Sequence, residues 1–299
     1  MVSLEELVVR AYSVAFGTSI LFLIAVGLNM IYGVMKVMNL AHTALFALGS
    51  YIVAGTVMKV IVDAFGLSPV YLLVVPPLIA GLTALVASAS IFPLLNFARG
   101  KGEEVQLLLT FGLLLVFEDV FRLVWGANPL RASEPYEVLG SMSIGEYTLP
   151  LYNVYLIVVT LILVVALWLL LFKTKMGTLI RAASMDLDMT RALGANATAI
   201  LLVVIFLSGF LAGLGGGLYV PAGSAMLGMS IEYLVLAFVV IVIGGLGSFV
   251  GALIGSLIVS ILRNIALVLF PEIELALIYL IAISILLVRP EGLMGGKRW

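Results

Sequence analysis

Long apolar segments joined by short polar connections constrain the fold of this chain more than any other feature. A helix needs about 20 predominantly apolar residues to cross the hydrocarbon core of a bilayer. The chain has eight regions of this kind, and Pro271-Glu-Ile-Glu274 divides the last region, which is too long for one helix. The nine resulting segments are residues 12–34, 40–62, 70–97, 105–125, 151–172, 199–220, 231–246, 251–269 and 275–288.

Composition supports the same interpretation. Hydrophobic residues make up 64% of the chain and charged residues 10%, whereas about a quarter of a soluble domain is charged. We therefore predict an all-α fold, a polytopic transmembrane helical bundle of eight or nine membrane segments that forms one domain over residues 1–299. The first six residues hold no basic side chain, which favours a retained first helix over a cleaved signal peptide. The net charge of −1 argues against a nucleic-acid partner, and the lack of cysteine excludes disulfides and thiolate metal sites; we expect no metal site.

Lysine and arginine indicate the orientation, because cytoplasmic loops carry an excess of them. With a cytoplasmic C-terminus and strict alternation, 173–199 becomes a cytoplasmic loop and 126–150 becomes the longest extracytoplasmic loop. Basic residues then favour the cytoplasmic side by two to one. The inner set is Lys36, Arg99, Lys101, Lys173, Lys175, Arg181, Arg191, Arg289, Lys297 and Arg298, and the outer set is Arg10, Lys59, Arg122, Arg131 and Arg263.

The polar stretch 173–199 separates two almost wholly apolar segments. Its alanine, methionine and leucine residues recur at helical spacing, which is typical of a short amphipathic helix. We predict a cytoplasmic coupling helix that docks on a separate partner protein; an ordinary solvated loop is the alternative. The residues proposed for coupling are Arg181, Asp186, Asp188, Arg191 and Gly194, the last of which is a reasonable helix stop.

Polar side chains inside apolar segments are costly and therefore informative. Asn29 needs a partner for its amide, and Asn39 can cap the helix that begins beside His42 and Thr43. These four residues are candidates for the translocation path, with simple satisfaction of backbone groups as the alternative. Arg263 lies nearer the outer end of its segment, where its side chain can snorkel to the interface.

Glycines gather in the C-terminal half at a spacing that favours close helix packing over a direct pore role. The packing candidates are Gly213, Gly244, Gly247, Gly251 and Gly255. No phosphate-binding loop, no nucleophile with a base and no carboxylate near the middle of a segment is present. We therefore expect no enzymatic activity and no ATPase site in this chain.

Several motifs together resemble those of branched-chain amino acid ABC transporter permeases. Gly27-Leu-Asn-Met-Ile-Tyr-Gly33 and Met38-Asn-Leu-Ala-His42 look like the N-terminal signature of that family. Gly244-Gly-Leu-Gly-Ser248 and Arg289-Pro-Glu-Gly-Leu-Met-Gly295 are similar to its C-terminal half. In the coupling stretch Arg181 stands where other ABC importers have glutamate, so the docking contacts differ.

The resemblance implies a permease subunit in the cytoplasmic (inner) membrane with no cofactor of its own. Its partners would be a second homologous permease, membrane lipid, two ATPase subunits that bind ATP and Mg²⁺ on the cytoplasmic face, and an extracytoplasmic substrate-binding protein. ATP binding would drive alternating access, and the cargo would be branched-chain or related hydrophobic amino acids. Relatives that carry urea, short amides or aromatic acids leave the substrate open, and a stand-alone secondary transporter is the other reading.

Overall fold

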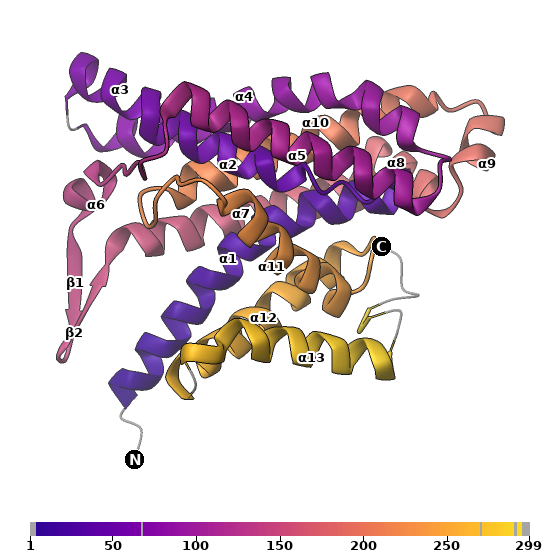
Figure 1. The fold of residues 1–299 in the computed structure, drawn as a ribbon. Coiled ribbons are helices and arrows are strands. Elements are labelled where there is room, and N and C mark those ends of the chain that lie inside the picture. Colours follow the sequence, from indigo (N-terminus) through magenta and orange to yellow (C-terminus); the bar gives the residue numbers. More distant parts are fainter. Residues whose placement is uncertain (1–3, 67, 270, 290–291, 295–299) are drawn as a thin grey trace.

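Helices make up nearly all of the fold (Figure 1). The structure, a computed structural model, describes residues 4–66, 68–269, 271–289 and 292–294. The helices are α1 (Leu4–Met35), α2 (His42–Ile52), a π-helical turn (Val53–Val57), α3 (Met58–Phe65), α4 (Pro69–Ala98), α5 (Glu103–Trp125), α6 (Glu134–Leu139), α7 (Leu151–Lys173), α8 (Lys175–Met185), α9 (Leu187–Ala192), α10 (Ala197–Tyr219), α11 (Met229–Gly244), α12 (Phe249–Leu269), a 3₁₀ turn (Pro271–Ile273) and α13 (Glu274–Val288).

A helix occupies each of the nine predicted apolar segments, but not all of these helices are long and apolar enough to cross a membrane. Within the described residues, six are long and apolar enough to cross a membrane: α1, the continuous α2–α3 unit, α4, α7, α10 and α12. The α11 helix and residues 276–288 of α13 are apolar but shorter, and α5 has acidic residues in its first turn. The chain is thus an all-α, multi-pass membrane protein, while the count of eight or nine segments stays a prediction.

The glycine-rich α10 packs at the centre of one layer, against α2 and α4. A Cβ atom on Gly216 would overlap the Phe46 carbonyl of α2, and one on Gly213 would overlap the Ala80 carbonyl of α4. The Ser50 hydroxyl also donates to the Gly216 carbonyl across the α2–α10 contact, at 2.9 Å. Small residues let helix backbones approach in this way, which strengthens van der Waals packing where lipid provides no hydrophobic driving force.

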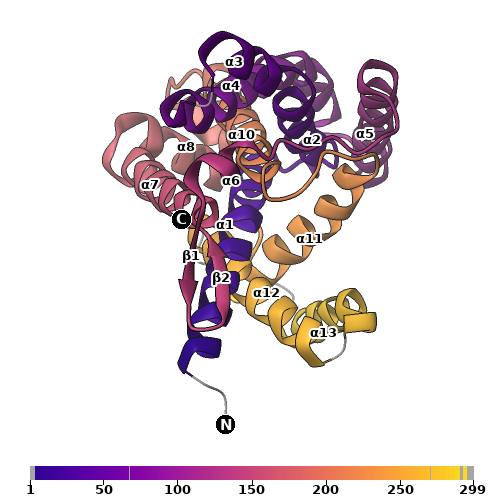
Figure 2. The same ribbon diagram turned by 90° about the vertical axis from the view of Figure 1, so that its left-hand side faces the viewer.

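A second layer is formed by α11, α12 and α13 (Figure 2). The α1 helix passes between this layer and the layer that holds α2, α4 and α10, and it packs against both α10 and α12. Gly244 and Gly251 approach so closely that a Cβ on either one would overlap the carbonyl of the other. A Cβ on Gly255 would overlap the Val240 carbonyl. These three glycines therefore lie in the contact between α11 and α12.

The described C-terminal residues fold back onto the end of α11. The Leu293 and Met294 amides donate to the carbonyls of Ile243 and Gly244, at 2.9 and 3.0 Å. Gly292 precedes them with φ of 75°, a conformation that favours glycine. The last carbonyls of a helix have no intrahelical partner, so part of the C-terminal motif serves to satisfy the end of α11. Residues 290–291 and 295 of that motif lie outside the described residues.

The predicted extracytoplasmic loop contains α6 and a β-hairpin. The hairpin pairs β1 (Ser141–Ile144) with β2 (Tyr147–Pro150) in antiparallel register, and Figure 1 places it at the end of the molecule opposite α9. In α6 the Tyr136 hydroxyl donates to Asn153 at 2.5 Å. Burial, with a smaller contribution from Tyr12, raises the pKa of Tyr136 to about 12, so its hydroxyl stays protonated at neutral pH.

Candidate functional site

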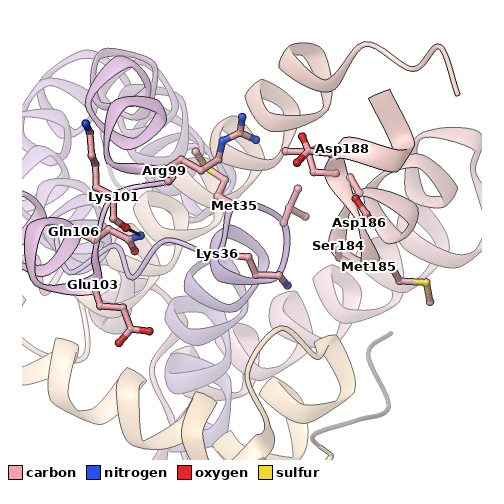
Figure 3. A pocket seen from close by; sticks show the side chains of 14 residues that line it. Met35, Lys36, Arg99, Lys101, Glu103, Gln106, Ser184, Met185, Asp186 and Asp188 are labelled. Atoms are coloured by element: carbon pink, nitrogen blue, oxygen red, sulfur yellow. Dashed lines mark hydrogen bonds between the residues drawn. The ribbon is translucent and has the colours of Figure 1, made fainter. Parts of the chain in front are cut away.

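Three connections that the charge distribution assigns to the cytoplasm meet around one pocket of about 670 Å³ (Figure 3). They are the turn after α1, the α4–α5 connection and the joint between α8 and α9. Lys36 and Arg99 extend into this region from the first two connections, and the third contributes Asp186 and Asp188. The pocket therefore places basic side chains beside acidic ones at a single end of the bundle.

The stretch predicted to form one amphipathic helix forms two, so that prediction was wrong in its detail. Asp186 separates α8 from α9 because its backbone is extended, with φ of −154° and ψ of 106°. Its amide donates to Ala182 and ends α8, while its carboxylate accepts the Met189 amide at 2.8 Å and begins α9. Gly194, with φ of 89°, follows the end of α9. We call residues 175–194 the α8–α9 elbow.

Arg181 faces back into the protein. Its guanidinium carbon lies 5.1 Å from the centre of the Phe172 ring, and its buried Nε has no hydrogen-bond partner among the described residues. Arg191 and Asp188 form an ion pair at 3.9 Å on the exposed side of α9, and such exposed pairs contribute little to stability. Arg181 thus fixes the elbow against α7, whereas Asp188 and Arg191 are available at the surface.

Three large apolar side chains of the elbow are more than half exposed among its charged ones. Met185, Met189 and Leu193 have exposed fractions of 68%, 58% and 82%. Their spacing of four residues was visible in the sequence, although the break at Asp186 was not. These three side chains are available for contact with a partner, and methionine adapts readily to a partner surface.

Asn29, predicted to lie on the translocation path, is buried and bound to the turn between α11 and α12. Its Nδ2 donates to the Ser248 carbonyl at 2.7 Å and to the Gly245 carbonyl at 3.3 Å. Its Oδ1 accepts the Gly247 amide at 2.5 Å, and Gly247 has φ of 80°. Asn29 therefore fastens the turn between α11 and α12 to α1.

The prediction that Asn39 caps α2 was wrong. The cap position is Ala41, with no side-chain cap bond, and Asn39 contributes its backbone carbonyl to the His42 amide at 3.2 Å. His42 Nε2 lies 3.2 Å from the Ile24 carbonyl, and the Thr43 hydroxyl contacts the Leu40 carbonyl at 3.4 Å. Asn39 does not cap the helix because α2 begins at His42, so the cap position falls at Ala41, two residues after Asn39.

We expect that replacing Asn29 with alanine lowers the stability of the protein. The change removes three hydrogen bonds and leaves the buried Gly247 amide without its partner, whereas the Gly245 and Ser248 carbonyls still accept the Ser248 and Ala252 amides. An unsatisfied buried group costs about 1–3 kcal/mol. Thermal unfolding of the purified protein measures the loss. Asn264→Ala is the matched control, because among the described residues the Asn264 amide donates within its own helix, to Ser260; equal loss of stability in both variants would contradict the role of Asn29.

The fold is that of a multi-pass helical membrane protein. A polar elbow lies at one end of the bundle, and the charge distribution assigns that end to the cytoplasm. Within the described residues, no group of three or more His, Cys, Asp or Glu side chains could hold a metal ion. A family model described as branched-chain amino acid transport system / permease component matches residues 11–286. The chain belongs to this family.

Curated relatives agree with this membership. The chain is 26% identical to the high-affinity branched-chain amino acid transport system permease protein LivH of Salmonella typhimurium, over 91% of this chain and 90% of the relative. It is also 26% identical to the corresponding protein BraD of Pseudomonas aeruginosa, over 91% of each. The ribose import permease protein RbsC of Escherichia coli is 29% identical over 62% of this chain and 60% of its own length. No solved structure matches the chain.

Proposed function

We propose that this chain is the membrane-spanning permease subunit of an ATP-binding cassette importer for branched-chain or related hydrophobic amino acids. The observation that carries the proposal is the family match over residues 11–286. The substrate class is that of the branched-chain amino acid permeases LivH and BraD, which match over more of this chain than the ribose permease does. A permease for urea, short amides or aromatic acids has no comparable support.

The subunit forms one transmembrane domain over residues 1–299 with nine membrane segments in the inner membrane. Six helices are long and apolar enough to cross the membrane. The helices α5, α11 and α13 supply the other three segments, with their polar ends in the membrane–water interfaces. The basic pocket residues Lys36, Arg99 and Lys101 support a cytoplasmic position for the end that holds the elbow.

The α8–α9 elbow is the docking element for an ATPase subunit. Its exposed Met185, Met189 and Leu193 provide apolar contact area, and Asp188 with Arg191 supplies a charged rim. Arg181, Asp186 and Gly194 define the shape of the elbow. Closure of two ATPase subunits on ATP and Mg²⁺ pushes the elbow, and the α7–α8 junction transmits this motion to the transmembrane helices.

Substrate reaches the opposite face from an extracytoplasmic binding protein, and a second homologous permease completes the path. Asn29, Asn39, His42 and Thr43 are buried, so their part in the path is to hold the helices that move. The glycine contacts of α10, α11 and α12 allow those helices to slide as close-packed units.

Reconstitution tests the proposal. The permease, its permease partner and the ATPase pair in proteoliposomes, with the external binding protein, should take up radiolabelled leucine, isoleucine or valine only when ATP is supplied on the ATPase side. Omission of the ATPase pair is the control. Uptake by the permease without any ATPase would contradict the proposal and favour a secondary transporter.

A further inference from the structure

Two cavities lie at the end of the bundle that carries α6 and the hairpin, and both are lined by Tyr219. The outer chamber, about 440 Å³, is formed by Arg131 and Tyr136 together with residues 221–224. The inner chamber, about 380 Å³, lies between the outer halves of α1 and α12 and the side chain of Tyr233. Both volumes fall in the range of about 300–1,000 Å³ typical of small-molecule sites.

Tyr219 stands between the two chambers. A Cβ added to Gly223, which lines the outer chamber, would overlap the phenol of Tyr219. The Tyr219 ring also meets the Tyr233 ring edge-on, with 5.3 Å between centroids, and packs 5.6 Å from the Phe46 ring. One aromatic side chain therefore contacts the walls of both chambers.

The inner chamber contains a charged group that is costly to place in an apolar helix. Arg263 lines the chamber and pairs with Glu274 through its Nε atom, at 2.5 Å. Their side chains are 33% and 13% exposed, so the expected snorkelling of Arg263 is replaced by an ion pair between α12 and α13. The ion pair uses Nε, and the terminal amino groups of a guanidinium are separate donors suited to a second carboxylate.

The rest of the inner chamber is amphipathic. Ser13, Ser260 and Asn264 contribute polar groups near Arg263, while Phe16, Ile20 and Leu267 contribute an apolar wall. An α-amino acid with an apolar side chain carries this same combination of one carboxylate, one ammonium and one hydrocarbon group.

We propose that the inner chamber is a transient binding site for an apolar α-amino acid on its way through the membrane. Arg263 binds the carboxylate, and the side-chain oxygen atoms of Ser13 and Asn264, which line the same chamber, accept hydrogen bonds from the ammonium group. The wall around Phe16 receives the hydrocarbon side chain. Tyr219 is the barrier that separates this site from the outer chamber, where Arg131 first meets the substrate. This inference rests on the proposed function, since it names the site at which the permease holds its cargo.

Protection of a single cysteine tests the site, because the natural chain contains no cysteine. Ser13→Cys is placed in the inner chamber of the complete transporter, and its reaction rate with a small maleimide is measured without binding protein. Saturating leucine should slow the reaction by about tenfold, whereas leucinol, which lacks the carboxylate, should not. Arg263→Lys, which keeps the charge but loses the planar fork, should abolish the protection.

Two controls make the result decisive. Tyr147→Cys on the hairpin should react at the same rate with and without leucine, and Arg122→Gln, at an exposed position on α5, should leave the protection of Ser13→Cys intact. Leucine uptake by the same complex without protection of Ser13→Cys would overturn the chamber alone. Failure of the wild-type complex to take up any amino acid would overturn the proposed function, and the chamber with it.

Discussion

Replacing Gly216 with leucine is expected to prevent assembly of the helical bundle. A side chain there would occupy the position of the Phe46 carbonyl, and it would also displace the Ser50 hydroxyl from its bond to the Gly216 carbonyl. Overpacking a well-packed contact costs about 1–3 kcal/mol and sometimes more, and backbone atoms of two helices cannot repack as flexible side chains do. Because proteins are stable by only about 5–15 kcal/mol, we expect little folded protein in the membrane.

Gly112→Leu is the matched control for this prediction. Gly112 lies within α5, and a Cβ there meets nothing within 4 Å, so a leucine should face lipid or solvent without displacing any described group. Membrane accumulation and the unfolding temperature in detergent measure both variants. Normal folding of Gly216→Leu, or an equal defect in Gly112→Leu, would contradict the close α2–α10 contact.

Removing the side chain of Asp186 is expected to uncouple ATP hydrolysis from uptake without preventing membrane insertion. Asp186→Ala loses the bond to the Met189 amide that begins α9, and loss of such a cap costs about 1 kcal/mol. An elbow with a disordered start of α9 should still contact the ATPase subunit, but it should transmit less of the ATPase motion to the transmembrane helices. We expect leucine taken up per ATP hydrolysed to fall by about tenfold, equivalent to about 1.4 kcal/mol of lost coupling.

Asparagine and aspartate are about equally good at a helix cap, so Asp186→Asn separates the shape of the elbow from its charge. This variant should keep most of the coupling, whereas the charge reversals Asp186→Lys and Arg181→Glu should lose it. Glu104→Gln, at an exposed position in the first turn of α5, controls for a general loss of negative charge on the same side of the protein. Equal uptake per ATP in Asp186→Lys and the unmodified protein would contradict the coupling role.

The apolar segments could be predicted because the membrane imposes a length and a hydropathy on each spanning helix. Their orientation rests on the lysine and arginine bias alone and stays a prediction. The packing of Gly251 and Gly255 also followed from spacing, since small residues at four-residue intervals share a helix face, and both approach the backbone of α11. These are local properties, and a single sequence records them directly.

Partners distant in the chain could not be predicted. Asn29 binds a turn more than two hundred residues away, and Arg263 pairs with a carboxylate across the break between α12 and α13. The joint at Asp186 was also missed, because the residues on either side of it keep the apolar spacing of a single helix, and an aspartate can lie on the exposed side of such a helix as well as begin a new one. In each case one side chain pairs with a backbone group or with an opposite charge, and the position of that partner depends on how the helices pack.

The sidedness of the α8–α9 elbow tests the account most directly. Met185→Cys suits the measurement, because Met185 is 68% exposed and the chain has no other cysteine; Ser184, beside it, is only 1% exposed. A membrane-impermeant maleimide is applied to intact cells and to inverted membrane vesicles that contain the full-length permease, with Tyr147→Cys on the hairpin as the opposite-face control. The account predicts that Met185→Cys reacts only in inverted vesicles and Tyr147→Cys only in intact cells; reaction of Met185→Cys in intact cells would contradict it.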